Sequence, residues 1–248
     1  MEVMPVNKRA QRNTPRYFDR WWFLVIAVVA LIILLITFRP DPYLNILKFV
    51  RNGISTTIYL TLVSFVLVMV FGLFVALARL SKNKVIRGVS TVYVEVVRGI
   101  PMMVQLIFWY FAFPALIQGI GDSLNITSLS GYNAEAISMA ILGLTFGYSA
   151  YMSEVYRAGI QSISRGQMEA ARSLGMTYIQ AMRHVILPQA VRVILPPVGN
   201  EFITLLKDSS LVSVVAVADM TRRGREYMAA HFLPIQTWIM IALLYLVM

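Results

Sequence analysis

The sequence predicts an all-α, polytopic membrane protein of about six transmembrane helices, with a helical loop on its cytoplasmic side. Composition is the first reason, since 58% of the 248 residues are hydrophobic and only 14% are charged. The second is a set of uncharged runs of about 18 residues or more, the length that a helix needs to cross a bilayer. The third is the concentration of Lys and Arg in alternate connecting segments, as in loops that stay inside the cell.

Five uncharged runs supply the clearest spans, at 21–38, 52–78, 99–121, 136–153 and 232–248. A sixth, roughly 194–218, is apolar except for Glu201, Lys207 and Asp208, so it carries charge into the membrane. The first run is too long for a secretory signal and no small-residue cleavage site follows it, so we interpret it as a retained helix. The last run is still apolar at its end, and we expect the native chain to continue beyond Met248.

With a cytoplasmic N-terminus, most basic residues fall in inner segments, namely 1–20, 79–98 and the region from Arg157 to Arg192. The outer loop 119–134 has none, whereas Arg222, Arg223 and Arg225 lie outside against the rule. The net charge of +10 therefore reflects topology and attraction to anionic lipid, and it does not indicate a nucleic-acid partner.

Three regions follow from this topology. Residues 1–20 form a cytoplasmic N-terminal tail, and residues 21–50 form an extra N-terminal transmembrane helix with an outer loop. Residues 51–248 form the main transmembrane domain, which contains the helical loop at about 164–190.

That loop contains Glu169-Ala-Ala-Arg-Ser-Leu-Gly175, followed by Val185-Ile-Leu-Pro188. Residues 167–174 suit two helical turns that end at Gly175 in the left-handed region. A second helix of about 177–186 is expected to stop before Pro188, because the residue before proline disfavours helical geometry. Ala170 and Ala171 are small enough for another protein to approach closely, while Leu174 and Met176 offer an apolar tip. The alternative is an amphipathic hairpin that lies on the lipid surface.

This pattern resembles the coupling loop of permease subunits of binding-protein-dependent ABC importers, with Val185 where Ile is more frequent. Other segments, from residue 52 to the end, are similar to the polar amino-acid branch of that family, which takes up histidine, arginine, glutamine and glutamate. The quoted segments are Ser55-Thr-Thr-Ile-Tyr-Leu-Thr61, Tyr93-Val-Glu-Val-Val-Arg-Gly-Ile-Pro101, Ala150-Tyr-Met-Ser-Glu154, Arg157-Ala-Gly-Ile-Gln161, Gly166-Gln-Met-Glu-Ala-Ala171, Asn200-Glu-Phe-Ile203 and Leu206-Lys-Asp-Ser-Ser-Leu-Val212. Ile100 and Ser209 replace a frequent Thr, and the first span is extra to the usual plan.

The resemblance implies a permease subunit in the bacterial inner membrane that moves polar amino acids into the cytoplasm. An extracytoplasmic binding protein would deliver the amino acid, and a second permease subunit, the same or a related chain, would complete the path. Two cytoplasmic ATPase subunits would grip the loops at Glu169, Ala170, Ala171, Leu174, Gly175 and Met176. The chain has no Gly-x-x-x-x-Gly-Lys-Ser/Thr segment, so ATP and Mg would be bound by the partner ATPase, and this chain would be neither an enzyme nor the holder of a cofactor.

Lys207 and Asp208 are candidates for the substrate site. Ionisable groups inside a span are costly and usually face a polar cavity or pair with each other. A zwitterionic amino acid needs both a cation and an anion, which these two residues supply, although neighbours on a helix point about 100° apart. The alternative is that this adjacent pair sits at the membrane boundary or bonds to other helices. The resemblance adds Ser209 and the turn at Gly99 and Ile100 as substrate-binding candidates.

The remaining polar residues have simpler interpretations. Glu154 and Arg157 are spaced i, i+3 and are expected to pair. No metal-ligand spacing surrounds His184 or His231, and the chain has no cysteine, so no metal site is expected. Ser149 does not indicate an intramembrane hydrolase, because the later histidines fall in loops on opposite sides. The rival function is an ion-gradient-driven amino-acid carrier built from inverted repeats, and no such repeat is visible between 52–118 and 136–218.

Overall fold

The computed structural model describes residues 20–248, so the predicted tail 1–20 lies outside the described residues except for Arg20. Every regular element within this range is a helix, as predicted. In chain order the elements are α1 (Arg20–Phe38), α2 (Pro40–Arg79), α3 (Lys84–Gly99), α4 (Met102–Ile107), the π-helical turn η1 (Phe108–Ala112), α5 (Phe113–Leu124), α6 (Thr127–Ser130), α7 (Ala136–Gln161), α8 (Arg165–Ser173), α9 (Tyr178–Ala181), the π-helical turn η2 (Met182–Ile186), α10 (Leu187–Asp208), the 3₁₀ helix η3 (Ser209–Val214), α11 (Met220–His231) and α12 (Pro234–Val247).

Among the described residues, three helical stretches are long and apolar enough to cross a membrane, at Pro40–Arg79, Met102–Leu124 and Ala136–Gln161. Two shorter apolar helices are Trp22–Phe38 and Pro234–Val247. Five of the predicted apolar runs therefore coincide with apolar helices.

The predicted span 194–218 is wrong in its limits, because α10 begins at Leu187 and ends at Asp208. The Ser209 hydroxyl donates to the Leu206 carbonyl at 2.6 Å, and such local bonds compete with a continuing α-helix. The chain continues as η3 and then takes a positive φ of 64° at Ala216.

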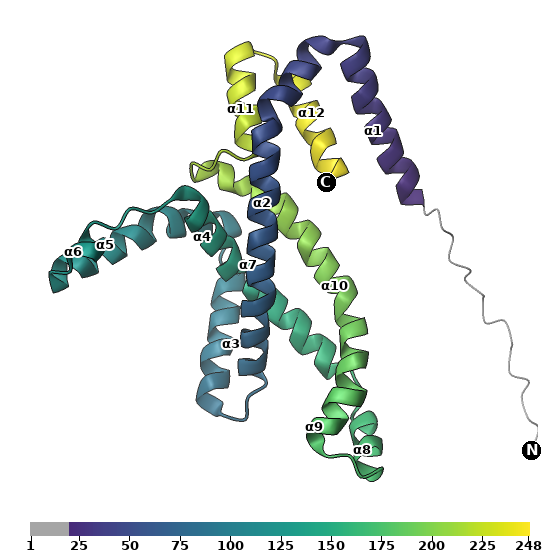
Figure 1. The fold of residues 1–248 in the computed structure, drawn as a ribbon. Coiled ribbons are helices and arrows are strands. Elements are labelled where there is room, and N and C mark those ends of the chain that lie inside the picture. The colour runs from purple at the N-terminus through teal and green to yellow at the C-terminus, as the bar shows by residue number, and fades with distance from the viewer. Residues whose placement is uncertain (1–19) are drawn as a thin grey trace, which may run out of the picture.

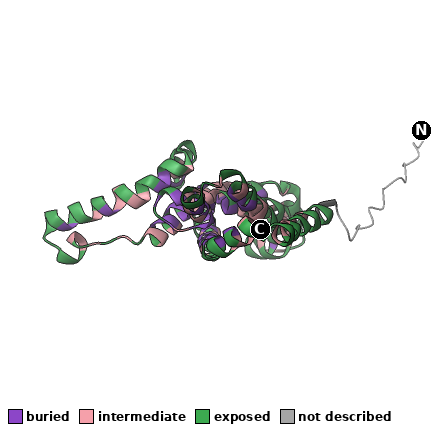
Figure 2. Cartoon of the chain, turned by 90° about the horizontal axis from the view of Figure 1, so that it is seen from above, coloured by how far each residue is buried: buried purple, intermediate pink, exposed green. Residues whose placement is uncertain are grey.

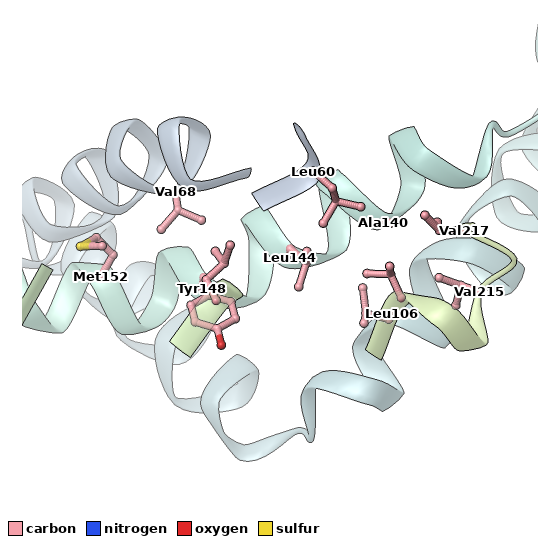
Figure 3. Close-up of a cluster of buried hydrophobic side chains, with 11 residues drawn as sticks. Leu60, Val68, Leu106, Ala140, Leu144, Tyr148, Met152, Val215 and Val217 are labelled. Carbon is pink, nitrogen blue, oxygen red and sulfur yellow. The ribbon is translucent and has the colours of Figure 1, made fainter. Parts of the chain in front are cut away.

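Helices α2 and α7 form the centre of the molecule and cross along much of their length (Figure 1). Their contact is close because Gly72 has no side chain, and a Cβ there would lie 2.8 Å from the Met152 Cβ. Small residues at such crossings let membrane helices approach each other. The buried cluster at this crossing also takes side chains from α4, η3 and the segment that follows it (Figure 3), and its labelled members are Leu60, Val68, Leu106, Ala140, Leu144, Tyr148, Met152, Val215 and Val217.

A second buried cluster packs α11 and α12 against the N-terminal part of α2, at the end where α1 also lies (Figure 1). Asp219 begins α11, since its carboxylate accepts hydrogen bonds from the backbone amides of Thr221 and Arg222, each at 3.0 Å. Burial raises the pKa of this carboxyl group, while the two amide donors act in the opposite direction. Gly53 allows the contact, because a Cβ there would lie 2.8 Å from the Asp219 carbonyl oxygen.

Helices α5 and α6 project from the rest of the molecule as an arm (Figures 1 and 2). They pack mainly against each other, and Gly121 permits this because a Cβ there would overlap the backbone of Leu129 and Ser130. Buried residues are concentrated where α2 and α7 cross, while the arm is mostly exposed or half-buried (Figure 2). The arm therefore receives little support from the body of this chain.

Candidate functional site

The predicted loop at 164–190 forms a helical hairpin, defined here as α8, the turn at Gly175 and α9, at the end of the molecule opposite to α11 (Figure 1). Gly175 has a φ of 84°, the left-handed conformation predicted for it. Its amide donates to the Arg172 carbonyl at 3.0 Å, and the Met176 amide donates to the Ala171 carbonyl at 3.2 Å. This pair of bonds is a Schellman motif, which satisfies the last carbonyls of α8 and reverses the chain.

The second half of the hairpin begins with a capping box. The Thr177 hydroxyl accepts from the Gln180 amide at 3.3 Å, and the Gln180 side chain accepts from the Thr177 amide at 2.9 Å. The Gln189 side chain bonds across to Gln167 at 3.3 Å, which joins α8 to the start of α10. Both ends of the turn are therefore fixed by hydrogen bonds.

The prediction that the second helix stops before Pro188 is wrong. Helix α9 runs through η2 into α10 without a break, and Pro188 lies in the first turn of α10. A π-helical turn is wider than an α-helical one, and such turns are found where a helix absorbs an irregularity. The hairpin is thus continuous with the helix that carries Asp208.

The exposed apolar tip of the hairpin differs from the predicted one. Leu174 is 81% exposed, as expected of a tip, but Met176 is half-buried and Ala171 is only 3% exposed, inside the hairpin. Ala170 and Glu169 do face outward. Sequence reasoning missed Tyr178 and Ile179, which are 57% and 76% exposed. The capping box at Thr177 was the sequence feature that could have indicated Tyr178 and Ile179. It begins a new helix, and the residues directly after a cap lie at the exposed end of that helix.

At the other end of α10, Asp208 accepts a hydrogen bond from the Tyr148 hydroxyl of α7 at 2.7 Å. Lys207 is exposed, and no ion pair joins these two described neighbours. The bond from Tyr148 joins Asp208 to another helix, as the alternative to a substrate role also expects. Tyr148 was missed by sequence reasoning, because nothing local in the sequence relates positions 148 and 208.

Further charged and aromatic side chains extend the polar surroundings of Asp208. Glu201 lies seven residues before Asp208 on the same side of α10, and its carboxylate interacts electrostatically with Arg98 and Asp208. The Arg98 guanidinium lies over the Tyr151 ring, 5.2 Å from its centroid. We call Arg98, Tyr148, Tyr151, Glu201 and Asp208 the polar face. It contains both signs of charge, drawn from three helices.

The other predicted site residues are not gathered with Asp208. Ser209 is fully buried and its hydroxyl is occupied by the Leu206 carbonyl, so it does not face the polar face. Gly99 lies in open space and Ile100 is 39% exposed, at the break between α3 and α4. The packing of α4 against η3 relates this break to the segment that contains Ser209.

The break at Ile100 and Pro101 is held by Gln105, which sequence reasoning also missed. Ile100 takes extended geometry before the proline, and this ends α3. The buried Gln105 amide nitrogen donates to the carbonyls of Val97 and Ile100, at 2.8 Å each. Gly147 on α7 leaves room for this side chain, because a Cβ there would lie 2.9 Å from its amide oxygen.

A charge cluster around Glu154 joins α7 to the C-terminal ends of α2 and α3. The predicted pair of Glu154 and Arg157 is confirmed, with nitrogen and oxygen 2.6 Å apart. Glu154 also binds Arg79 of α2, and Arg98 lies 3.8 Å away. These two partners come from helices distant in sequence, which is why spacing did not predict them.

The arginines that the topology places outside against the charge rule are also partly paired. Arg222 and Arg223 each lie 3.1 Å from the Glu226 carboxylate. Arg225 donates to the Ser213 hydroxyl at 3.2 Å. Two of the three arginines thus share one carboxylate on α11, and the third is held by a neutral hydroxyl of η3.

Comparison with known proteins gives consistent matches. Residues 68–248 match the family described as "Binding-protein-dependent transport system inner membrane component". The chain is 38% identical over 196 residues to the arginine transport system permease protein ArgU of Corynebacterium glutamicum, with 77% of this chain and 60% of ArgU covered. It is 36% identical over 197 residues to the probable glutamine ABC transporter permease protein GlnM of Bacillus subtilis, with 79% and 85% covered.

A solved structure described as an amino acid ABC transporter with histidines is also similar. One of its chains superposes with a TM-score of 0.71 at 39% identity, with 81% of this chain and 87% of that chain covered. The family match, residues 68–248, includes the hairpin and the polar face, begins within α2 and leaves α1 outside it.

Proposed function

The chain belongs to the family of binding-protein-dependent transport system inner membrane components, and from that premise we propose that it carries polar amino acids into the cytoplasm as the membrane-spanning subunit of an ABC importer. The relatives named above support the substrate class, since their names specify arginine, glutamine and an amino acid transporter. The membrane would be the inner membrane, with the N-terminus in the cytoplasm.

The observation that carries this proposal is the hairpin. It is built by a Schellman motif and a capping box, it is polar except for its exposed tip, and it continues directly into the helix that carries Asp208. Exposed Leu174, Tyr178 and Ile179 form an apolar anchor of the kind that fills a pocket on a partner protein. We assign that pocket to a cytoplasmic ATPase, which would bind ATP and Mg itself.

Within the hairpin, the contact residues would be Glu169, Ala170 and Leu174 together with Tyr178 and Ile179. Ala171 and Met176 would act from inside by packing the two halves together, and Gly175 by allowing the reversal of the chain. The complex would contain two permease subunits, as in a two-fold symmetric assembly. With one hairpin on each permease, it would bind two ATPases.

For the substrate, the polar face offers what a zwitterion needs. Asp208 and Glu201 would be anions for the ammonium group, and Arg98 a cation for the carboxylate. Lys207, exposed next to Asp208 and outside the polar face as defined, would be a second cation. Tyr148 would orient Asp208 by its hydrogen bond. Gly99 and Ile100 would contribute exposed backbone at the helix break. Ser209 would hold the start of η3 in place from its buried side.

The test is reconstitution into liposomes, with and without the co-purifying ATPase and the extracytoplasmic binding protein. We expect uptake of a labelled polar amino acid that requires ATP and all subunits. Mass spectrometry of ligand retained by the binding protein would give the amino acid. Uptake by this chain alone, driven by an ion gradient and indifferent to ATP, would instead establish the secondary carrier.

The apolar anchor has its own test. Replacing Leu174 and Ile179 by Ser should abolish co-purification of the ATPase, since burial of two such side chains contributes several kcal/mol, about 1.5–3 for each. Phe232→Ser is the matched control, because Phe232 is equally exposed but lies at the opposite end of the molecule. Unchanged recovery of the ATPase with the Leu174 and Ile179 variant would place the ATPase contact elsewhere.

A further inference from the structure

A groove of ≈ 810 Å³ lies between α2, α3 and α7 and has no role in the proposed transport path. Its walls are hydrocarbon, chiefly from the exposed side chains of Phe71, Phe74, Val85, Val89, Leu142 and Phe146. The hydroxyls that reach it are mostly engaged, since Ser90 donates to the Ile86 carbonyl at 2.8 Å and Tyr93 to the Phe146 carbonyl at 2.6 Å. The groove therefore fits an apolar chain and offers little to a polar ligand.

The groove lies on a different side of α7 from Tyr151 of the polar face. Leu142 lines the groove, and Tyr151 of the polar face follows it nine residues later on α7. Nine residues are two and a half helical turns, so the two side chains point in opposite directions, about 180° apart. A helix with its polar path on one side presents its other side to lipid or to a neighbouring protein.

The dimensions of the groove suit one leaflet of a bilayer. On α2 it extends from Leu67 to Ala78, which is about 16 Å at a rise of 1.5 Å per residue. Half of a hydrocarbon core of about 30 Å is about 15 Å. An acyl chain that entered at one end would thus fill the groove.

The charge at one end identifies the kind of lipid. The turn from α2 to α3 places exposed Lys82, Lys84 and Arg87 beside Val85 and Ile86 at the mouth of the groove. The sequence from 67 to 94 contains no Asp or Glu, and among the described residues no ion pair involves these three cations. Arg79, the fourth cation nearby, is already bound by Glu154.

We propose that this groove binds an anionic phospholipid, with an acyl chain against Phe71, Phe74 and Phe146 and the phosphate at Lys82, Lys84 and Arg87. The site would select the head group by charge and would be occupied from the leaflet that meets the turn between α2 and α3. Clusters of basic residues at a membrane surface attract anionic lipid in this way. A neutral phospholipid would fill the groove but would not be retained at the cations.

Trp109 lines the groove and allows a direct test by fluorescence. The chain has 4 Trp, so a variant with Trp21, Trp22 and Trp238 changed to Phe reports from Trp109 alone. The assembled transporter, with the Trp residues of its partner subunits also changed to Phe, would be placed in nanodiscs with increasing fractions of brominated phosphatidylglycerol or brominated phosphatidylcholine. We expect phosphatidylglycerol to quench Trp109 at a mole fraction at least roughly tenfold lower, because the contributions of the three cations to the attraction multiply.

Two variants make the result specific. Changing Lys82, Lys84 and Arg87 to Gln should remove the preference for phosphatidylglycerol, while changing exposed Arg39, Lys48 and Arg51 at the other end of α2 should not. Val89→Phe, which narrows the groove, should reduce quenching by both lipids. Retained uptake would confirm that each variant is folded.

Three outcomes would overturn the proposal. Equal quenching by the two lipids would mean that only bulk lipid contacts the groove. No quenching by either would mean that a protein, such as the second permease subunit, covers it. Equal loss of preference in both triple variants would mean that net charge, and not this site, selects the lipid.

Discussion

At the residue scale, Gly175 and Asp208 show two ways in which one position depends on its surroundings. Gly175 depends only on local backbone geometry, which the spacing of small and polar residues around it predicted. Asp208 depends on Tyr148, a residue of another helix that is 60 positions away. The conformation of Gly175 could be predicted from the sequence, whereas the hydrogen-bond partner of Asp208 could not.

Gly175→Val should stop transport while the protein remains in the membrane. No atom would meet an added Cβ, so the cost is conformational, about 1–2 kcal/mol for a left-handed L-residue and more for a β-branched one. Uptake and recovery of the ATPase would be measured relative to protein in the membrane. Gly119→Val is the control, because Gly119 is an exposed glycine in open space within α5. Normal coupled uptake by Gly175→Val would refute the assignment of the hairpin.

Lys207→Met and Asp208→Asn should each reduce uptake severely, and the double variant should be at least as impaired. If both groups bind substrate, removing the second cannot restore what the first lost. A double-mutant cycle on uptake, normalised to protein in the membrane, measures this. Recovery in the double variant would exclude the substrate site.

At the scale of elements, apolar runs predicted where helices lie but not how they are joined. The run 99–121 does contain a spanning helix, yet the chain breaks at Ile100 and Pro101, and Gln105 from the following turn holds the break. Pro188 led to the opposite error. A helix end was predicted before Pro188, but the π-helical turn η2 lets the helix continue into α10. Both differences come from hydrogen bonds that the periodicity of apolar residues does not encode.

Glu154→Gln should destabilise the junction of α2, α3 and α7. Arg79 and Glu154 are only 11% and 22% exposed, and loss of one partner leaves the other charge poorly solvated, at a cost of about 3 kcal/mol. Thermal unfolding of the purified protein would show a lower midpoint. Glu226→Gln is the matched control, since Glu226 also binds two arginines but is 39% exposed, where pairs contribute about 1 kcal/mol or less. Equal midpoints for the two variants would contradict this interpretation.

At the scale of the whole molecule, one crossing of α2 and α7 supports the elements that carry function. α3 and α10 both pack against α7, and α11 packs against α2. Composition and hydropathy were enough to predict an all-α membrane protein. They could not predict this crossing, because it depends on Gly72 meeting Met152 across 80 positions of sequence.

Gly72→Ala should therefore weaken the whole molecule more than one methyl group suggests. The added Cβ would lie 2.8 Å from the Met152 Cβ, which is held by its own backbone, so the two helices must separate. Overpacking of this kind costs about 1–3 kcal/mol. Thermal unfolding is the measurement, with Gly199→Ala on α10 as a control in open space. An unchanged midpoint in Gly72→Ala would mean that the crossing relaxes freely.

The passage of the helix through Pro188 has a mechanical consequence. From Tyr178 to Asp208 the chain forms a continuous helical stretch of about 46 Å, at 1.5 Å per residue, with Pro196 and Pro197 inside it. A tilt of about ten degrees at the hairpin would move the far end by roughly 8 Å, far beyond the reach of the hydrogen bond between Tyr148 and Asp208. The hydrogen bond between Tyr148 and Asp208 therefore reports the tilt angle of this helical stretch. Its presence or absence would show whether a partner bound at the hairpin has moved the stretch.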